Sequence, residues 1–381
     1  MSATKPSREA TEAHQSLRYD ALRDRVTVID QTRLPHEFLE RELVSLEDAC
    51  ESISAMWVRG APLIGVTAAF GVYLALRSHA SGGGVERGTA AQLEDAIERL
   101  AATRPTAINL RWALNRVGSH LRAVADAERV DESLAIARAL HAEDIAACAA
   151  LGEHGADLLE DCWRNKCREA EAFGGSVPER LNVLTHCNAG SLATVDWGTA
   201  LAVIYKAQAR GLPVHVWVDE TRPRNQGAAL SCWELARRGV EHTLIVDNAG
   251  GHLMQHGLVD CCVVGSDRTT LNGDVCNKIG TYGVAISARH HNIPFHVVAP
   301  LSTVDPALPS GDLIPIEERP AEEITEGFGH RTAPRDVEVY APAFDVTPAA
   351  LVTSIITEVG IIESPDTAKM ERALRDGGVS F

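Results

Sequence analysis

The chain has 381 residues, of which 45% are hydrophobic and 23% are charged, a composition typical of globular proteins. This length is enough for two domains, because single hydrophobic cores stop growing at about 250–300 residues. The formal net charge of −16, from 36 basic and 52 acidic residues, argues against broad nucleic-acid binding. Any anionic ligand must therefore be held by a few local cations.

Targeting signals and cysteine usage narrow the class of protein further. The start of the chain is polar, so we expect no secretory signal, and there is no apolar run of the roughly 18 residues that a membrane span needs. The nine cysteines include no CxxC pair and no regular zinc spacing, which gives no indication of a metal site. We therefore expect a reduced, cytoplasmic protein in which most thiols are buried.

The first half of the chain is predicted to be mainly helical. Apolar residues recur there at three- and four-residue spacing, and short strands such as residues 25–30 precede them. The helical segments are residues 44–73, 90–122 and 131–159.

From Leu181 onward, short β-rich runs alternate with helical runs and Gly-punctuated turns. This alternation predicts an α/β fold with a doubly wound, mostly parallel sheet. The domain boundary falls within residues 160–181, and we place it so that the domains are residues 1–165 and 166–381. Residues 302–342, rich in Pro, Asp and Glu, are predicted to leave the sheet before a last helix at residues 347–359.

Polar side chains follow the predicted strand in the run LNVLTHCNAG, residues 181–190. A parallel strand presents its carboxyl end to the ligand crevice, so Cys187 is placed to touch a substrate. The alternative is that Cys187 is a small buried hydrophobe, as most free cysteines are. Its neighbours His186 and Asn188 are polar, and a helix predicted to open after Gly190 favours a thiolate.

Asp267 follows a second apolar strand, residues 260–265, in the turn GSDR. An Asp in this position often caps the next helix or turn, and that interpretation stays open. The functional interpretation is a general acid or base, or a ligand to sugar hydroxyls. General acid catalysis near neutral pH requires a raised pKa and hence a dry pocket.

Three segments place a cation beside a predicted helix start. Asn277 and Lys278 lie where a loop feeds a helix, and free backbone N–H groups there favour an anion. Arg59 and Arg104 each precede a helix start that contains proline. Ordinary exposure and capping explain any one of these segments alone, whereas the three cations together would form a phosphate clamp if the domains meet.

The segment VWVDETRPRNQG, residues 216–227, runs from a strand into a loop rich in charged and amide side chains. Asp219 or Glu220 could bind ribose hydroxyls there, as acids after the second strand of nucleotide-binding folds do. A solvated loop is the alternative. The chain has no GxGxxG sequence, which argues against NAD as a cofactor.

Seven motifs that appear in order make the chain resemble the methylthioribose-1-phosphate isomerases of methionine salvage. That family is homologous to the regulatory subunits of the exchange factor for translation initiation factor two. The resemblance covers residues 30–360 and implies a helical N-terminal domain, a Rossmann-like C-terminal domain and a homodimer. The motifs are RGAPLIG, RPTAINLRWA, THCNAGSLATVDWGTAL, VDETRPRNQGA, DNAGG, GSDRTTLNGDVCNKIGTYG and IPIEERPAEEI.

The resemblance also implies roles for individual residues, with Cys187 and Asp267 matching the family's catalytic pair. Three departures leave the exact substrate preference open: Leu63 stands where Ala is expected, SDRTT replaces ADRIA, and Cys276 precedes the NK pair. The family's substrate-binding positions fall on Arg59, Gly60, Ala61, Arg104, Gln226, Asn277 and Lys278.

The chemistry of such an isomerase explains why these residue types are wanted. The anomeric carbon of methylthioribose 1-phosphate is blocked, so the ring must open with the phosphate attached before hydrogen moves from C2 to C1. A protonated Asp267 would act as general acid on the ring oxygen, and Cys187 would handle the C2 proton or stabilise the developing charge. Arg59, Arg104 and Lys278 would hold the phosphate, and no metal or redox cofactor is needed. Proton transfer and a direct hydride shift both remain open.

The nearest alternative is an isomerase of another 1-phosphopentose, either 5-deoxyribose 1-phosphate or ribose 1,5-bisphosphate. The bisphosphate needs a second cation cluster, whereas a methylthio group needs an apolar pocket. Candidates for that pocket are Trp57, Val58, Leu63 and Trp197.

Two further classes of protein are compatible with parts of the sequence. A noncatalytic regulatory module like the initiation-factor relatives would have no need of both Cys187 and Asp267. A thiol-dependent hydrolase is disfavoured, because His186 is adjacent to Cys187 and would point to the opposite face of the strand.

Overall fold

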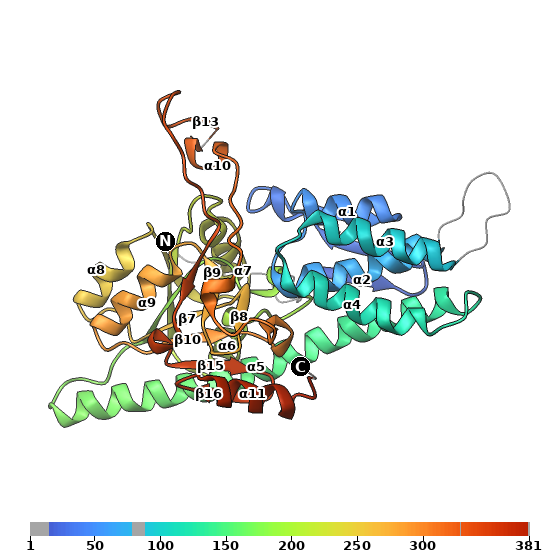
Figure 1. Ribbon diagram of the computed structural model, residues 1–381. Coiled ribbons are helices and arrows are strands. Elements are labelled where there is room, and N and C mark those ends of the chain that lie inside the picture. The colour runs from blue at the N-terminus through green and yellow to red at the C-terminus, as the bar shows by residue number, and fades with distance from the viewer. Residues whose placement is uncertain (1–14, 78–87, 328, 380–381) are drawn as a thin grey trace.

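The computed structural model describes residues 15–77, 88–327 and 329–379 of the chain. Helices and a small antiparallel sheet form the first half, and a larger, seven-stranded sheet with helices packed against it forms the second (Figure 1). The predicted fold class is confirmed. No helix within the described ranges is long and apolar enough to cross a membrane.

The first half packs around one central helix, residues 61–77, which is buried on almost all sides, as expected for a helix that is apolar all round. The predicted segments 44–73 and 90–122 are each divided into two helices, and the breaks between them contain Arg59 and Arg104. The elements are β1 (Leu17–Asp20), β2 (Arg25–Ile29), β3 (Glu40–Leu43), α1 (Leu46–Ser54), α2 (Ala61–Arg77), α3 (Ala90–Thr103) and α4 (Ile108–Arg122).

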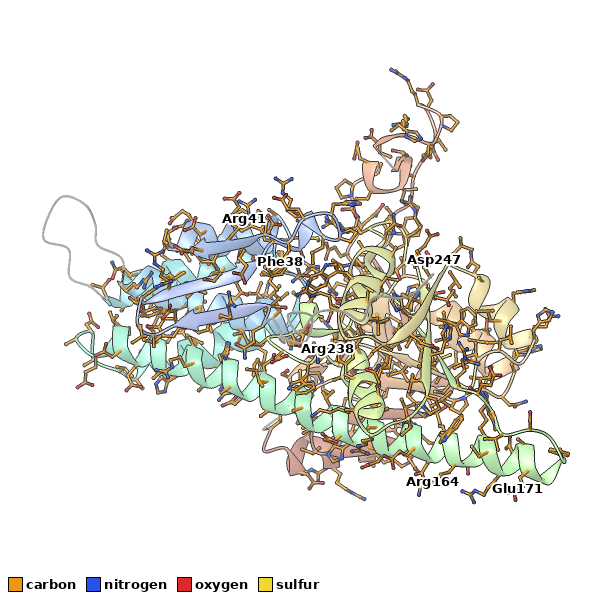
Figure 2. All side chains as sticks on the ribbon, turned by 180° about the vertical axis from the view of Figure 1, so that it is seen from behind. Phe38, Arg41, Arg164, Glu171, Arg238 and Asp247 are labelled. Atoms are coloured by element: carbon orange, nitrogen blue, oxygen red, sulfur yellow. The ribbon has the colours of Figure 1, made fainter. Side chains whose placement is uncertain are left out.

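One helix, α5 (Arg129–Ala172, 44 residues), runs through both halves of the molecule (Figure 1 and, from behind, Figure 2). Leu140 in its first part is buried in the same core as Phe70 of α2. Leu159, further along, is buried in the core against the large sheet. The expected division of the chain at residue 165 lies inside this helix and stays a prediction.

A mostly parallel sheet lies at the centre of the second half. Its strands are β4 (Leu181–Thr185), β5 (Val214–Asp219), β6 (Glu241–Ile245), β7 (Cys261–Val264), β10 (Phe295–Val298), β15 (Ser354–Thr357) and β16 (Gly360–Glu363). Their spatial order is β16-β15-β10-β7-β4-β5-β6, and only the pair β15–β16 is antiparallel. The helices are α6 (Ala200–Ala209), α7 (Cys232–Arg237), α8 (Ala249–Gln255), α9 (Thr281–His290) and α11 (Thr367–Asp376).

Helices cover both faces of this sheet, so successive residues of a strand enter different cores. Val183 of β4 packs in the core formed with α5, α6 and α7, and Leu184 packs in the core formed with α8, α9 and α11. The strand order reverses at β4, which pairs with β5 on one side and with β7 on the other. Ligands of doubly wound folds bind at the carboxyl ends of the strands beside such a reversal.

Residues 302–342 leave the large sheet, as predicted. The chain first adds to a second sheet of order β11-β8-β9-β14 and then projects from the body as an arm (Figure 1). The elements are β8 (Arg268–Thr270), β9 (Val275–Lys278), β11 (Val304–Asp305), β14 (Phe344–Thr347) and, in the arm, α10 (Glu322–Thr325), β12 (Glu326–Gly327) and β13 (His330–Arg331).

The helix predicted at residues 347–359 is wrong. The structure places a 3-10 turn at Ala349–Leu351 and then β15, which lies between β10 and β16 and is buried along its whole length. Its sequence SIIT is rich in β-branched side chains, which favour strands. Apolar spacing alone does not distinguish such a short buried strand from a piece of buried helix.

Candidate active site

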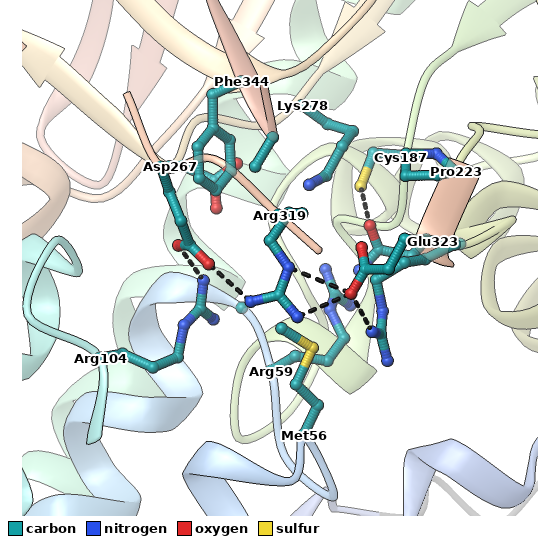
Figure 3. Close-up of a pocket in the computed structure, with 15 residues that line it drawn as sticks. Met56, Arg59, Arg104, Cys187, Pro223, Asp267, Lys278, Arg319, Glu323 and Phe344 are labelled. Carbon is teal, nitrogen blue, oxygen red and sulfur yellow. Dashed lines mark hydrogen bonds and ion pairs between the residues drawn. The ribbon is translucent and has the colours of Figure 1, made fainter. Parts of the chain in front are cut away.

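Cys187 and Asp267 follow the neighbouring strands β4 and β7, at the reversal of the sheet, and line one cavity (Figure 3). The cavity contains about 500 Å³ of space not filled by atoms. Most of the predicted substrate-binding residues line it too, although they come from both halves of the chain. These are Arg59, Gly60, Arg104, Gln226 and Lys278.

Gly60 reaches this cavity because its backbone passes very close to a neighbouring segment. Its φ is +94°, and a Cβ at this position would lie 2.4 Å from the Ala193 backbone oxygen, so only glycine fits. Ala61 lines an adjoining cavity. Asn277 is buried, and its Nδ2 donates to Thr281 Oγ1 at 3.1 Å rather than facing either cavity. The binding roles of these residues stay predictions.

Cys187 is held in a left-handed backbone conformation, with φ of +67°, and is 7% exposed. Its amide donates to Thr221 Oγ1 at 2.8 Å, and its Sγ donates to Gln226 Oε1 at 3.4 Å. Burial raises the pKa of the Cys187 thiol and outweighs the opposing effect of Arg59 and Lys278. The thiol is therefore neutral near pH 7.

The expectation that a helix N-terminus favours a thiolate at Cys187 is wrong. After Gly190 the chain makes only a 3-10 turn, Ser191–Ala193, and α6 does not begin until Ala200. Glycine followed by serine is as typical of a turn as of a helix start. No helix dipole therefore offsets the desolvation of the thiol.

The turn that follows Cys187 is held by Glu234, a buried residue of α7 that the sequence analysis missed. The Glu234 carboxylate accepts hydrogen bonds from Asn188 Nδ2 at 2.9 Å and from the amide and hydroxyl of Ser191, both at 2.7 Å. The Arg59 guanidinium donates to the Asn188 backbone oxygen at 2.6 Å and also to its side-chain oxygen. Glu234 thus fixes both the thiol and one of the cations, through Asn188.

Asp267 lies beside a strand that brings a cation to it. Its amide donates to the Cys276 backbone oxygen of β9 at 2.9 Å, and Lys278 is the last residue of that strand. Burial raises the pKa of Asp267, although Lys278, Arg59 and Arg104 partly oppose the shift. A raised pKa favours the protonated carboxyl group, the form that general acid catalysis uses.

The three predicted cations differ in how far other groups already engage them. Arg59 is bonded to Asn188, and Arg104 Nη2 pairs with Glu317 at 3.1 Å. Lys278 Nζ lies 4.4 Å from the centre of the Phe344 ring, and within the described residues it makes no ion pair with a carboxylate. Lys278 is therefore the cation most available to an anionic ligand.

The expected anion site at the start of α9 is occupied by the chain itself. Asn277 and Lys278 lie in β9 and not in a loop. The amides of Gly280 and Tyr282 at the start of α9 donate to the two oxygens of Asp345 at 2.7 and 3.1 Å. The helix terminus does bind an anion, but the anion is a side chain from β14 that is distant in sequence.

The arm closes one side of the cavity with a chain of alternating charges (Figure 3). From Arg104, ion pairs lead to Glu317 at 3.1 Å, on to Arg319 at 2.8 Å, to Glu323 at 2.7 Å and finally to Arg224 at 2.9 Å. The sequence analysis gave these arm residues no individual roles. The charged residues of this chain of ion pairs come from separate segments, and nothing in the local sequence indicates that the segments lie side by side.

The adjoining cavity, which Asp267 also lines, is mainly apolar, although Arg104 and Arg268 line it as well. It contains about 430 Å³ of free space, part of it open to solvent. The residues predicted to supply apolar surface do not line it; Val58 and Leu63, for example, are fully buried in the helical core. Its apolar lining is instead Ala61, Ile64, Ala107, Ile314, Pro315 and Phe344.

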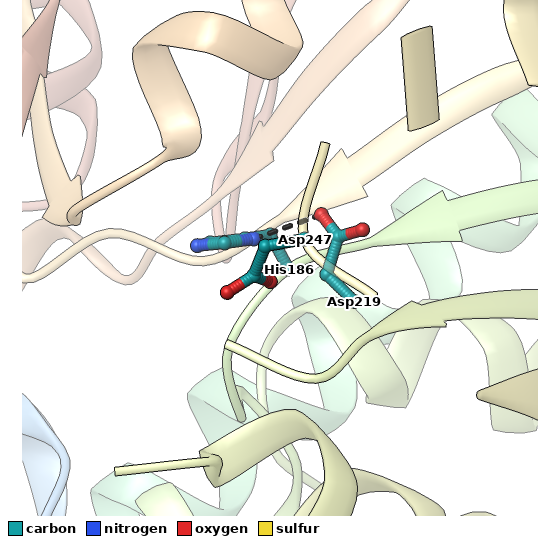
Figure 4. A group of neighbouring side chains, drawn as sticks. All are labelled: His186, Asp219 and Asp247. Atoms are coloured by element: carbon teal, nitrogen blue, oxygen red, sulfur yellow. Dashed lines mark hydrogen bonds and ion pairs between the residues drawn. The ribbon is translucent and has the colours of Figure 1, made fainter. Parts of the chain in front are cut away.

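Asp219 does not line these cavities and so is not placed to bind ribose hydroxyls, as one interpretation of its loop suggested. Its Oδ2 instead lies 2.9 Å from Nδ1 of the buried His186, with Asp247 close by (Figure 4). Within the described residues, His186, Asp219 and Asp247 form a group whose ligand atoms lie within 4.8 Å of one another, close enough to be tested as a metal site. Both ring nitrogens of His186 already have protein partners, Asp219 at Nδ1 and the Ile279 backbone oxygen at Nε2.

Comparisons with known proteins show the family of the chain. A model of the initiation factor 2 subunit family matches residues 57–364. A methylthioribose-1-phosphate isomerase from Methylorubrum populi is 56% identical over 350 residues, which cover 88% of this chain and 90% of that protein.

Solved structures give the same relationship. The structure of 5-methylthioribose 1-phosphate isomerase from Pyrococcus horikoshii OT3 matches with a TM-score of 0.81 and 40% identity, covering 98% of this chain and 99% of that one. Subunit delta of translation initiation factor eIF-2B from A. fulgidus matches with a TM-score of 0.77 and 39% identity, covering 94% and 100%. The chain belongs to the initiation factor 2 subunit family and, within it, to the methylthioribose-1-phosphate isomerases.

Proposed function

We propose that this protein converts 5-methylthioribose 1-phosphate to 5-methylthioribulose 1-phosphate, an aldose–ketose isomerisation in methionine salvage. The observation that carries the proposal is one cavity that joins a buried thiol, Cys187, and a carboxyl group of raised pKa, Asp267, to a free cation, Lys278. The isomerase relatives named above, which cover most of the chain, support the same reaction.

Asp267 begins the reaction as a general acid. Its carboxyl proton passes to the ring oxygen, the bond between that oxygen and C1 breaks, and C1 becomes an oxocarbenium centre that still bears the phosphate. Burial favours the protonated form of Asp267 before the step, and Lys278 and Arg59 stabilise the carboxylate that the step leaves.

The neutral thiol of Cys187 favours a direct hydride shift for the second step. Hydride moves from C2 to C1, and the C2 hydroxyl then returns a proton to the Asp267 carboxylate, so that protons and electrons balance. Cys187 lines the cavity as a polarisable hydrogen-bond donor rather than as a base. A proton route would require Cys187 to ionise against the desolvation that raises its pKa.

The cations would bind the phosphate end of the substrate, and the apolar surface would bind its methylthio end. Lys278 would bind the phosphate with Arg59 and Arg104, as charge-assisted contacts to phosphate require. The apolar cavity beyond Asp267 would receive the methylthio group. Ribose 1,5-bisphosphate would place a second phosphate against the mainly apolar lining of that cavity, where Arg104 and Arg268 are the cations, whereas 5-deoxyribose 1-phosphate would leave part of the cavity unfilled.

The test is to incubate the protein with methylthioribose 1-phosphate and to follow the 1-phosphoketose by phosphorus and carbon NMR. Ribose 1,5-bisphosphate and 5-deoxyribose 1-phosphate run in parallel, with Cys187→Ala and Asp267→Asn as controls. We expect turnover of the methylthio sugar, which Asp267→Asn should abolish. Cys187→Ala should lower the turnover, because it removes a hydrogen-bond donor from the cavity and not a base. Turnover of none of the three sugars would instead favour a noncatalytic regulatory module.

Solvent isotope exchange separates the two routes of hydrogen transfer. In D2O, a hydride shift retains the substrate hydrogen at C1, whereas a proton route admits solvent deuterium there. We expect retention. Substantial deuterium at C1 would show that Cys187, or another group, acts as a base.

We also propose that the protein is cytoplasmic, because its nine unpaired cysteines are suited to a reducing compartment.

We propose in addition that the protein is a homodimer. Strand β6 is an edge of the large sheet, and Leu244 in it and Val246 just after it are 50% and 64% exposed. An exposed apolar edge strand is a template for pairing with another chain. Light scattering should give a dimer that Leu244→Glu weakens, and a monomeric wild type would contradict the proposal.

A further inference from the structure

His186 is a buried residue that contacts two of the segments that form the active-site cavity. It follows β4, is 2% exposed and directly precedes Cys187. Its Nδ1 lies 2.9 Å from Asp219 Oδ2, at the end of β5 (Figure 4). Its Nε2 lies 2.9 Å from the backbone oxygen of Ile279, which follows Lys278.

The partners of the ring determine where its protons lie. The Ile279 carbonyl can only accept a hydrogen bond, so Nε2 carries a proton. Nδ1 faces a carboxylate, and a proton there turns a contact between two acceptors into a charge-assisted hydrogen bond. With protons on both nitrogens, the ring is an imidazolium.

The charged groups around the ring favour this cation. Asp219 faces it from β5, Asp247 from the turn after β6, and Asp345 from β14. Burial lowers the pKa of His186, but its contacts with Asp219 and Ile279 and the charge of Asp247 bring the pKa above its ordinary value. Burial also raises the pKa of Asp219, a shift that the contact with His186 opposes.

We propose that His186 is a positioning residue, held as an imidazolium, that fixes the Cys187 turn relative to Lys278. A second path reinforces it, because Thr221 Oγ1 donates to the Asp219 backbone oxygen at 3.0 Å and accepts from the Cys187 amide at 2.8 Å. Loss of the Nδ1 proton would leave two acceptors, Nδ1 and the Asp219 carboxylate, facing each other at the ends of β4 and β5, behind the thiol. The catalytic part of this proposal rests on the proposed isomerase function.

A metal ion is the competing occupant of this cluster. Its binding would have to displace the proton on Nδ1, because Nε2 faces the Ile279 carbonyl. The two oxygens of Asp247 already accept the amides of Thr221 at 2.8 Å and Arg222 at 2.7 Å. A single proton satisfies His186 and Asp219 without further ligands.

The protonation state is tested directly, without any assay of activity. NMR of protein labelled with ¹⁵N-histidine, with His186→Gln or Asp219→Asn to assign the signal, should show protons on both ring nitrogens of His186 at pH 7.5. A ring with one proton at that pH would overturn the proposal. So would a zinc or manganese ion found bound to the purified protein at one equivalent and lost in Asp219→Asn.

The positioning role is tested by the pH profile of Asp219→Asn, which keeps an acceptor oxygen but removes the negative charge. We expect the alkaline limb of kcat/KM to move to lower pH by about one unit, with kcat near pH 6 within about threefold of wild type. An equal fractional loss at every pH would indicate a structural role only and would overturn the proposal. The matched control is His215→Gln, a buried histidine of β5 bonded to Thr243 at 2.9 Å, which should leave the profile unmoved.

Discussion

Glu317 of the arm accepts a hydrogen bond from Arg104 at 3.1 Å, inside the cavity that Cys187 and Asp267 also line. Glu317 accepts a second bond from Thr106 Oγ1 at 3.2 Å. Although burial raises its pKa, Arg104 and Arg319 bring the pKa of Glu317 below its ordinary value, so the group is an anion. A carboxylate of the chain thus takes the place on Arg104 that we assign to a substrate phosphate.

Replacing Glu317 by Gln should therefore strengthen phosphate binding. The substitution removes the charge that competes for Arg104. We expect the inhibition constant of inorganic phosphate to fall about threefold to tenfold, because a partly exposed ion pair contributes about 1 kcal/mol. Glu318→Gln, at an exposed neighbour, is the control. Weaker phosphate binding in Glu317→Gln would mean that Glu317 holds Arg104 in place for the substrate.

The reactivity of Cys187 should follow its raised pKa. Alkylation requires the thiolate, so modification by iodoacetamide should be slow at pH 7 and should still be accelerating above pH 8.5, about where an ordinary thiol is half ionised. Peptide mass spectrometry at Cys187 measures the rate of modification, and bound methylthioribose 1-phosphate should lower that rate. Fast modification at pH 7 would show that the thiolate is the resting form.

Glu234→Gln should destabilise the protein. The amide group offers donors where the carboxylate accepts bonds from Asn188 and Ser191, and mismatched buried polar groups cost about 1–3 kcal/mol each. Urea denaturation should show a fall in the free energy of unfolding of about 3 kcal/mol. The exposed Glu241 offers the matched control Glu241→Gln. An unchanged midpoint in Glu234→Gln would contradict the role of this carboxylate.

Asp144 should make stability depend on pH. Burial raises the pKa of this α5 carboxyl group to about 7, although it accepts a bond from the Val195 amide at 2.7 Å. Because the folded pKa exceeds the unfolded one, the stabilising contribution is complete below about pH 4 and is lost as the pH rises through 7.

The substitution Asp144→Asn removes this dependence. Its melting temperature should exceed that of wild type at pH 8 and should match it more closely at pH 5. Asp131→Asn, at a second acid of α5, is the control. A constant difference between Asp144→Asn and wild type at both pH values would argue against titration of Asp144.

The parts of the site that the sequence predicts are those with a local signal. Cys187 and Asp267 each follow a short apolar run that predicts a strand. Polar residues at the end of such a strand can be recognised as candidates without knowing where the strand lies in the sheet. Glu234 and Glu317 have no such signal, because Asn188 and Ser191, which bind Glu234, and Arg104, which binds Glu317, lie more than 40 residues away in the sequence. The helix expected at residues 347–359 was wrong for the same reason, since burial between two other strands decided the conformation of β15.

The continuity of α5 has a consequence for how the protein unfolds. At about 1.5 Å per residue, its 44 residues form a rod of about 66 Å whose two parts are buried in different cores. If one core unfolded alone, the other core would still hold its own part of α5 helical. The apolar side chains of the remaining part of α5 would then be exposed to water. Calorimetry should therefore record one cooperative transition, and catalysis and helicity should be lost at the same temperature.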